Sequence, residues 1–244
     1  MSQTPSRKPH VVLNLASRQH KGEKIRRLLD LQPDGSTKLR ILEIGTGSGG
    51  IAHYLASQSE HFHVHAVDVV DNRLITEGYQ FRMVSDTQLP FDDGYFDIVI
   101  SNHVIEHVGE AAQQLEHLNE IRRILSPAGK GYLAVPNRWM LVEPHYRLAF
   151  LSYLPRSLRS PYLRLCGKGQ FYDCEPLSRG ELERMLAQAN FDYTNLCAQA
   201  LKLTLVIEQP GSLADRLAER TPTWLINHFA SIIPTLIYRI SKKG

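Results

Sequence analysis

Cysteine is scarce in this sequence, and the few cysteines present do not form a recognisable framework. The 244 residues contain three, Cys166, Cys174 and Cys197, and no two of them have C-x-x-C spacing. An odd number of scattered cysteines argues against a disulfide scaffold and favours reduced thiols in a reducing compartment. We therefore expect a cytoplasmic protein.

Long apolar runs and a strong charge imbalance are also missing. The first ten residues, MSQTPSRKPH, lack the apolar core of a secretory signal. Polar residues and a proline interrupt the longest apolar run, WLINHFASIIPTLIYRI, so a transmembrane span is not expected. The formal net charge of +3 is too small to indicate a nucleic-acid partner on electrostatics alone, and we expect none.

The first half of the chain alternates short apolar runs with helical patterns. Helices are expected over 17–31, from the glycine-rich loop to about residue 58, and over 110–125. Strands are expected at RILEIG (40–45), HVHAVDV (63–69), RMVSD (82–86), FDIVISN (96–102) and GYLAVPN (131–137). This alternation predicts an α/β fold with a parallel sheet and helices on both faces.

The alternation stops after Asn137 and resumes at residue 178. Ser178 and Glu181 form a capping box that predicts a helix over 178–191. The stretch DYTNLCAQAL (192–201) is strand-like, residues 212–232 are helical, and PTLIYRISKK (234–243) is predicted as an edge strand, where a leading proline is tolerated. We divide one domain, 1–244, into four parts: an arm and helix (1–37), a core (38–137), an insertion (138–177) and a C-terminal part (178–244).

The stretch LEIGTGSGG (42–50) satisfies the G-x-G-x-x-G pattern of dinucleotide-binding loops. Glycines after a first strand let the backbone approach a ligand closely, and the next helix N-terminus offers free N–H groups. Glu43 changes the interpretation, because a carboxylate there would repel the pyrophosphate of NAD. It suits the ammonium and sulfonium of S-adenosylmethionine (SAM). The alternative is that Glu43 only bonds a neighbouring backbone group.

LEIGTGSGG resembles motif I of the class I SAM-dependent methyltransferases. Four more stretches are in register with that family: VHAVDVVD, SDTQLPFDDGYFDIVIS, SNHVIEHV and LNEIRRILSPAGKGYLAVPN. The resemblance covers about residues 38–137, and 178–200 more weakly. It is strongest to the small-molecule branch that includes ubiquinone- and menaquinone-pathway methyltransferases. It implies a doubly wound, Rossmann-like sheet of seven mostly parallel strands with a reversed last strand, and SAM as cofactor.

The resemblance also implies which residues hold the cofactor. Asp68 would bind both ribose hydroxyls, since a short carboxylate can accept two hydrogen bonds from a vicinal diol. Asp86 and Thr87 would meet the adenine ring, although Asp86 also suits a turn. The full set of cofactor-binding candidates is Glu43, Gly45, Thr46, Gly47, Gly49, Asp68, Val69, Asp86, Thr87 and Asn102.

The stretch NHVIEH places His103, Glu106 and His107 at i, i+3 and i+4, on one face if it is helical. His103 and His107 are our catalytic candidates, with His103 as a general base near working pH. In ubiquinone-type O-methyltransferases the matching loop carries two Glu and a His as metal ligands, and His103 replaces the first Glu. We favour Glu106 and His107 as braces of the loop and expect no metal.

Basic and aromatic residues are interleaved in the insertion, with five Arg and one Lys against three acidic residues over 138–176. In the family this insertion after the fifth strand is a lid over the substrate, and we expect a helical lid here, which makes His145, Tyr146, Arg147 and Tyr172 our substrate candidates. The alternative is a helical excursion whose aromatics pack on the core. Residues 212–244 could contact a membrane surface peripherally, but we favour a buried helix stripe.

The sequence thus predicts methyl transfer from SAM to a small or lipid-like acceptor, at oxygen. An RNA or protein methyltransferase on the same fold is one alternative, although SNHV is neither an NPPY-type motif nor a catalytic cysteine. A NAD-dependent oxidoreductase is a second alternative, disfavoured by Glu43. A non-catalytic SAM-binding partner protein is a third.

Overall fold

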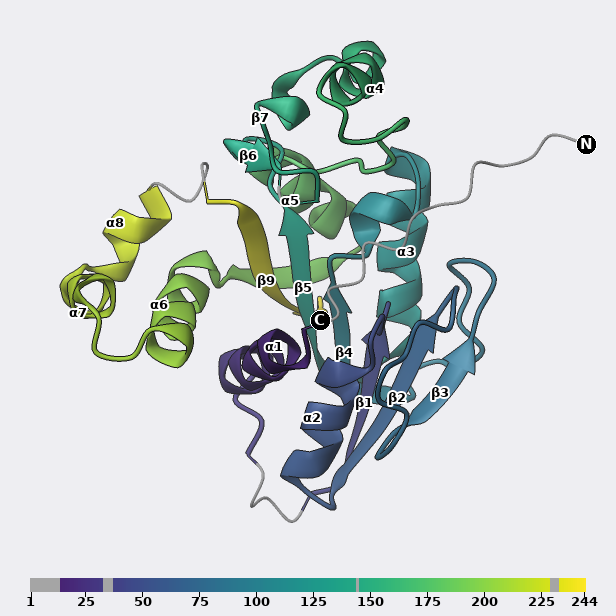
Figure 1. The fold of residues 1–244 in the computed structure, drawn as a ribbon. Coiled ribbons are helices and arrows are strands. Elements are labelled where there is room, and N and C mark those ends of the chain that lie inside the picture. The colour runs from purple at the N-terminus through teal and green to yellow at the C-terminus, as the bar shows by residue number, and fades with distance from the viewer. Residues whose placement is uncertain (1–13, 33–36, 144, 229–232) are drawn as a thin grey trace, which may run out of the picture.

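The computed structural model describes residues 14–32, 37–143, 145–228 and 233–244. Seven strands form one sheet in the order β3-β2-β1-β4-β5-β9-β8 (Figure 1). Strands β3, β2, β1, β4 and β5 are parallel, and β9 is antiparallel to both of its neighbours. Their bounds are β1 Leu39–Ile44, β2 Phe62–Asp68, β3 Gln80–Met83, β4 Phe96–Asn102, β5 Leu125–Pro136, β8 Phe191–Asn195 and β9 Thr235–Lys242.

The predicted seven-stranded, mostly parallel sheet with a reversed last strand is confirmed, but the position of the last strand differs. β9 lies between β5 and β8, and β8 takes the edge. Leu236, Tyr238 and Ile240 of β9 are accordingly buried. The edge position was predicted from Pro234, which cannot donate a hydrogen bond within a sheet. Pro234 precedes the first paired residue, Thr235, so its missing N–H removes no bond from the sheet and does not restrict β9 to an edge.

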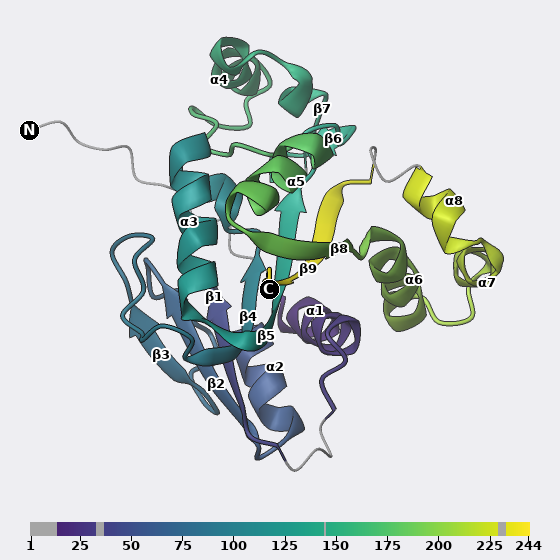
Figure 2. The same ribbon diagram turned by 180° about the vertical axis from the view of Figure 1, so that it is seen from behind.

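Helices cover both faces of the sheet, as Figures 1 and 2 show from opposite sides. Alternate residues of each strand point to opposite faces, so Ile41 packs on one face and Leu42 on the other. The face of Ile41 is covered by α1 (Leu15–Leu28), α2 (Gly50–Gln58) and α6 (Cys197–Glu208). The face of Leu42 is covered by α3 (Ala111–Ile124) and α5 (Arg179–Gln188). This is the doubly wound arrangement that the sequence predicts.

The C-terminal elements differ most from the sequence-based expectation. The capping box at the start of α5 is confirmed, with the Ser178 N–H donating to Glu181 at 2.8 Å. The predicted strand over 192–201 is wrong beyond Asn195, whose side chain accepts a hydrogen bond from the Cys197 N–H and starts α6. The helix expected over 212–232 is split into α7 (Leu213–Arg220) and α8 (Thr223–His228). Residues 229–232, and most of the expected N-terminal arm, lie outside the described residues.

The insertion is not purely helical. It contains a short hairpin of β6 (Val142–Glu143) and β7 (Leu148–Ala149), a 3₁₀ turn η2 (Leu151–Tyr153) and α4 (Arg156–Leu165). Its own small core is formed by Leu148, Leu151, Leu163, Tyr172 and Cys174. Figures 1 and 2 show it beyond the carboxyl end of β5, next to the upper end of α3.

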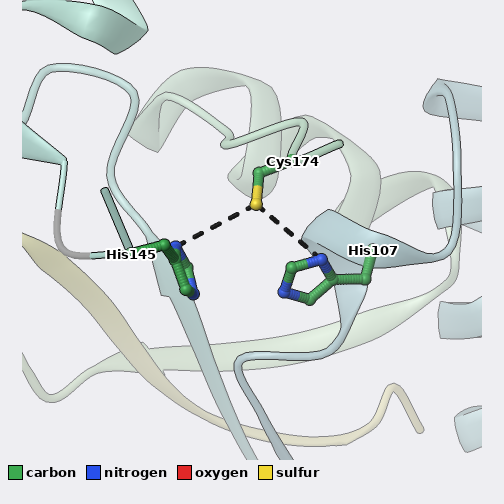
Figure 3. A group of neighbouring side chains, drawn as sticks. All are labelled: His107, His145 and Cys174. Carbon is green, nitrogen blue, oxygen red and sulfur yellow. Dashed lines mark hydrogen bonds between the residues drawn. The ribbon is translucent and has the colours of Figure 1, made fainter. Parts of the chain in front are cut away.

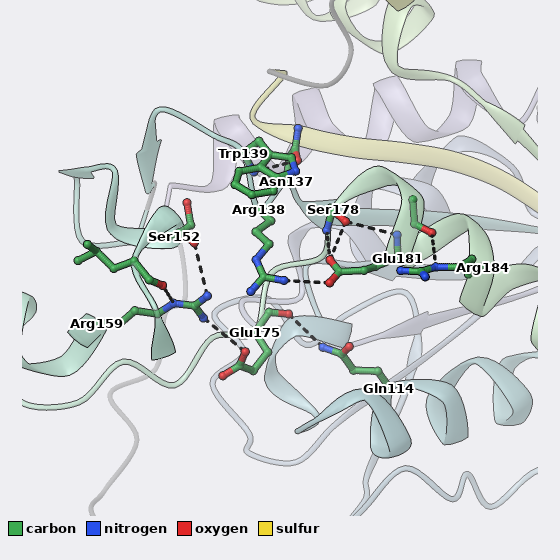
Figure 4. A network of polar contacts seen from close by, with 12 residues as sticks. Gln114, Asn137, Arg138, Trp139, Ser152, Arg159, Glu175, Ser178, Glu181 and Arg184 are labelled. Carbon is green, nitrogen blue, oxygen red and sulfur yellow. Dashed lines mark hydrogen bonds and ion pairs between the residues drawn. The ribbon is translucent and has the colours of Figure 1, made fainter. Parts of the chain in front are cut away.

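Polar contacts fix the insertion to the rest of the chain (Figure 4). The guanidinium of Arg159 is 2% exposed and donates to the Leu154 carbonyl at 3.0 Å and to Glu175 at 3.4 Å. The backbone of Glu175 continues the connection, because its N–H donates to the Glu106 carbonyl and its carbonyl accepts from Gln114 of α3. The insertion is therefore attached at the loop that follows β4.

An apolar stripe on α7 and α8 faces outward. Leu213, Leu217 and Trp224 are 84%, 69% and 71% exposed, and α7 has no buried residue. The buried stripe that the sequence favoured is therefore wrong for α7. None of the helices in the described ranges has both the length and the apolar character needed to cross a bilayer.

Candidate functional site

Three glycines of the loop between β1 and α2 have left-handed backbone conformations, which favour glycine. Gly45, Gly47 and Gly49 have φ of +72°, +54° and +80°. A Cβ on Gly45 would lie 2.5 Å from Val104 Cγ2, and one on Gly49 would overlap the Tyr79 hydroxyl. The loop is therefore packed closely against the segments that follow β4 and β2.

Glu43 lies at the base of this loop and is 1% exposed. One carboxylate oxygen accepts hydrogen bonds from Thr46 Oγ1 at 2.7 Å and from the Ala52 N–H at 3.0 Å. Burial raises the pKa of Glu43 to about 7, against the opposing effects of Thr46 and of the nearby Arg18 charge. Glu43 thus braces the loop and the first turn of α2, which is the alternative role recognised in the sequence.

Asp68 ends β2 and joins it to the same loop. Its Oδ2 accepts from the Gly47 N–H at 2.8 Å, and its Oδ1 accepts from the Val69 N–H at 2.8 Å. The side chain is partly exposed at the carboxyl edge of the sheet. Oδ1 also accepts from the Val70 N–H at 3.4 Å. Each carboxylate oxygen has two lone-pair directions, so Oδ2 keeps one for a ribose hydroxyl, and Oδ1 can take a second hydroxyl in place of the long Val70 contact.

The remaining cofactor candidates follow neighbouring strands at the same edge. The Val84 N–H, after β3, donates to the Asp68 carbonyl, so the Asp86–Thr87 segment emerges beside the end of β2. Asp86 itself accepts from the Gln88 N–H at 2.8 Å and is a turn residue in this structure. Val69 is exposed, and Asn102 is the last residue of β4.

The loops after β1 and β4 meet at this edge. Along the chain the strands step outward from β1 to β3, and β4 then starts on the other side of β1. Such a reversal leaves a crevice at the carboxyl ends of the two central strands, where α/β proteins bind ligands. Val104 packs on Gly45 at this point, and His103, with φ of +59°, directly follows β4.

Glu106 is a fully buried carboxylate between two histidines. Its Oε1 lies 3.3 Å from His103 Nδ1 and 3.9 Å from His107 Nε2, and among the described residues neither oxygen has a partner in good hydrogen-bond geometry. Burial raises the pKa of Glu106, but His103 and His107 together lower it below its ordinary value. The sequence-predicted trio is therefore brought together around one buried carboxylate.

The insertion brings a second group to the same place (Figure 3). The rings of His107 and His145 are 5.6 Å apart, and Cys174 Sγ lies 3.7 Å from His107 Nδ1 and 4.0 Å from His145 Nδ1. His145 Nδ1 is also 2.6 Å from the buried carboxylate of Glu143. Burial lowers the pKa of His145, but the carboxylates of Glu143, Glu106 and Asp173 together more than offset this and the net shift is upward.

The other substrate candidates have different surroundings. The rings of Tyr146 and Tyr172 are 5.7 Å apart in the core of the insertion. Tyr172 is 6% exposed, and its buried hydroxyl has no hydrogen-bond partner among the described residues. Arg147 is exposed with φ of +54°, on the hairpin turn between β6 and β7.

Sequence reasoning missed Cys174, Glu143 and His117 as neighbours of the candidate site. His117 is buried on α3, 3.0 Å from Ser101 Oγ, and burial lowers its pKa to about 4. No short motif marks these residues, because Cys174, Glu143 and His117 come from three separate segments. Only the fold of the insertion over the loop after β4 brings them together.

The hydrogen-bonding groups at this edge of the sheet fit SAM. The glycine loop allows a ligand close to the backbone, Asp68 offers a carboxylate to a ribose diol, and the Glu43 carboxyl at the base of the loop disfavours a pyrophosphate there. Residues 16–196 match the family described as "Methyltransferase domain".

Two of the curated relatives are named for methylation at different atoms, one at oxygen and one at nitrogen. The chain is 33% identical over 110 residues to the ubiquinone biosynthesis O-methyltransferase of Rickettsia akari, covering 42% of each chain. It is 36% identical over 107 residues to the glycine/sarcosine/dimethylglycine N-methyltransferase of Actinopolyspora halophila, covering 39% of this chain and 18% of that one.

A solved structure of a putative sarcosine dimethylglycine methyltransferase from Galdieria sulphuraria superposes with a TM-score of 0.56 at 13% identity. The superposition covers 92% of this chain and 86% of that one. The chain spans 42% or less of the length of the curated relatives it matches. The matched family, the sheet order and the glycine loop together establish that the chain belongs to the class I SAM-dependent methyltransferases.

Proposed function

We propose that this chain transfers a methyl group from SAM to a small or lipid-like acceptor, at an oxygen atom. The observation that carries the proposal is the pair formed by His103 and Glu106 at the end of β4. The Glu106 carboxylate is 3.3 Å from His103 Nδ1. A carboxylate close to one ring nitrogen stabilises the charged form of the imidazole, so the other nitrogen can take a proton from a hydroxyl.

The roles of the other residues follow from their positions. Asp68 holds the ribose, and the glycine loop packs against the methionine part of the cofactor. Bound SAM supplies an electrophilic methyl group on sulfur, which needs little activation. The chain's main contribution is then alignment of the acceptor oxygen with that methyl group, together with removal of the hydroxyl proton by His103.

The insertion supports a small or amphiphilic acceptor. It is attached beside His103 through Glu175 and Glu106, and it presents the exposed Arg147 together with partly exposed aromatic rings. A nitrogen acceptor is the second candidate, favoured by the similarity to the glycine/sarcosine/dimethylglycine N-methyltransferase. An unprotonated amine needs no general base. Dependence of the transfer rate on His103 therefore distinguishes an oxygen acceptor from a nitrogen acceptor.

The experiment is transfer of labelled methyl from SAM to matched pairs of acceptors that differ only in hydroxyl versus amine. Oxygen transfer predicts product from the hydroxyl member and its loss in His103→Asn. Product from the amine member alone, at the same rate in His103→Asn, would replace this proposal with N-methylation.

A lipid-like acceptor would require the protein to bind a membrane surface peripherally. The exposed Leu213, Leu217 and Trp224 lie near Arg216 and Arg220 on α7 and α8, an apolar face flanked by positive charge. Co-sedimentation with anionic vesicles should be lost in Leu217→Asp. Unchanged sedimentation would exclude this face as the membrane-binding surface.

We place the protein in the cytoplasm, where Cys166, Cys174 and Cys197, all free thiols, would stay reduced.

A further inference from the structure

We propose that His107, His145 and Cys174 form a zinc site that fastens the insertion to the loop after β4. One nitrogen of each ring and Cys174 Sγ all lie within 4.8 Å of one another. Figure 3 shows the three side chains converging from separate segments. His107 belongs to the turn after β4, His145 to the hairpin of the insertion, and Cys174 to the segment between α4 and α5.

The distances suit a tetrahedral ion. Zinc bonds are about 2.3 Å long to sulfur and about 2.0–2.1 Å long to nitrogen. In a tetrahedral site, the sulfur atom and each nitrogen atom are therefore about 3.6 Å apart. The observed separations between Cys174 Sγ and the Nδ1 atoms are 3.7 Å for His107 and 4.0 Å for His145. Small side-chain shifts would therefore complete the site, with a fourth position left to water.

The chemistry of the donors selects the metal. A thiolate with two imidazoles is a soft to borderline donor set, which favours zinc over magnesium or calcium. This set differs from the His103, Glu106 and His107 trio that the sequence offered, in which no thiol takes part. It assigns His107 to the metal and leaves His103 to the acceptor.

Buried carboxylates support a cation at this place. Glu106 and Glu143 are 0% and 1% exposed, and Glu106 has no hydrogen-bond partner in good geometry among the described residues. A buried carboxylate is costly unless positive charge compensates it. Glu106 is 3.9 Å from His107 Nε2, and Glu143 is 2.6 Å from His145 Nδ1. Glu106 lies on the side of the His107 ring opposite the nitrogen that faces Cys174, where carboxylates stand behind zinc-ligating histidines. Glu143 contacts His145 Nδ1 itself, so zinc bound at that nitrogen would displace this contact and leave the Glu143 carboxylate as a negative charge beside the ion.

Binding requires one proton to leave. Cys174 is a thiol whose pKa is raised by burial and by the Asp173 carboxylate, so it is unreactive by itself. Zinc binds the thiolate, the Cys174 proton goes to solvent, and no electrons are transferred. Affinity must then fall as the pH is lowered.

The test uses untagged full-length protein, stripped with a chelator and titrated with Zn²⁺ alone. We expect one zinc per chain, at least a 100-fold loss of affinity in Cys174→Ser, and no change in Cys166→Ser, which replaces an exposed cysteine outside the group. Zinc binding that Cys174→Ser leaves intact, or no stoichiometric binding by the wild type, would overturn the proposal.

Substitution of cobalt into the wild-type protein tests the site without requiring that the Cys174→Ser variant folds. Co²⁺ bound by Cys174 should give the intense charge-transfer absorption of a cobalt–thiolate bond, displaced by one equivalent of Zn²⁺. Absence of that band in folded wild-type protein contradicts the site, whatever the behaviour of Cys174→Ser. The SAM affinity of each variant, measured in parallel, reports whether the core remains folded.

Discussion

The Gly47 N–H donates a hydrogen bond of 2.8 Å to the carboxylate of Asp68. This contact joins the glycine loop after β1 to the end of β2, two segments that are 21 residues apart in sequence. The loop and the carboxylate are therefore positioned as one unit at the carboxyl edge of the sheet. We propose that this unit binds SAM and that the segments covering it bind the acceptor.

Glu43→Gln should change how stability depends on pH. Burial raises the pKa of the native carboxyl to about 7, above the ordinary value of 4.5. Between these values the native state holds a proton that the unfolded state has lost, so Glu43 lowers stability as the pH rises through this window. Gln keeps the acceptor oxygen and has no charge to bury.

Urea unfolding without SAM measures the effect. The variant's advantage over the wild type in free energy of unfolding should grow by about 2–3 kcal/mol between pH 5 and pH 8. An advantage that is the same at both pH values would mean that Glu43 titrates normally, and would remove burial as the dominant influence on it.

The fold could be predicted well from the sequence where local pattern and tertiary position agree. The parallel strands from β1 to β5 are apolar runs separated by helical patterns, and their ends were predicted within three residues except at the start of β5. That strand begins at Leu125 and not at residue 131, so it includes the SPAGK stretch before the predicted run. β9 was misplaced because a leading proline says nothing about which strands pair on either side. α6 was missed because its start depends on the Asn195 side chain, which caps the turn to Cys197.

The candidate site was predicted in part for the same reason. Glu43, Gly47 and Asp68 belong to short motifs whose spacing follows from one strand–loop–helix unit and its neighbour. Cys174 and Glu143 belong to no motif, because their proximity to His107 depends on how the insertion folds back over β4. The hydrogen bond from the Glu175 N–H to the Glu106 carbonyl of the loop helps to fix that arrangement.

His103→Asn should lower turnover without weakening SAM binding. Asn tolerates the left-handed backbone that His103 adopts, at φ of +59°, so the loop after β4 is preserved. Loss of a general base typically lowers the rate by about 10²–10⁴-fold. Single-turnover transfer and SAM affinity are measured side by side, and equal turnover in the two proteins would exclude His103 as the base.

Tyr172→Phe separates packing from acceptor binding. Its hydroxyl is buried without a hydrogen-bond partner among the described residues, so removing it should leave the melting temperature unchanged or raise it. If the hydroxyl instead contacts the acceptor, KM for the acceptor rises while SAM affinity stays constant. An unchanged KM together with a higher melting temperature would make Tyr172 a core residue only.

Replacing residues 141–170 with a short Gly/Ser linker should abolish transfer to the acceptor and leave SAM affinity within about tenfold, roughly 1.4 kcal/mol. The reason is that Glu43, Gly47 and Asp68 lie on β1, β2 and the loop between them, outside the replaced segment. Melting temperatures with and without SAM report folding. A folded variant that methylates at the wild-type rate would show that the insertion is scaffold, and would move the acceptor to α1 near Gln19 and His20.

Calorimetric titration of SAM into the wild type and Asp68→Ala tests the central claim most directly. Asp68→Ala removes a charged acceptor of hydrogen bonds, so the account predicts SAM binding weaker by about 1.5–3 kcal/mol. Asp192→Ala, an exposed carboxylate on the edge strand β8, should bind SAM as the wild type does. Equal SAM affinity in Asp68→Ala and Asp192→Ala would contradict the account.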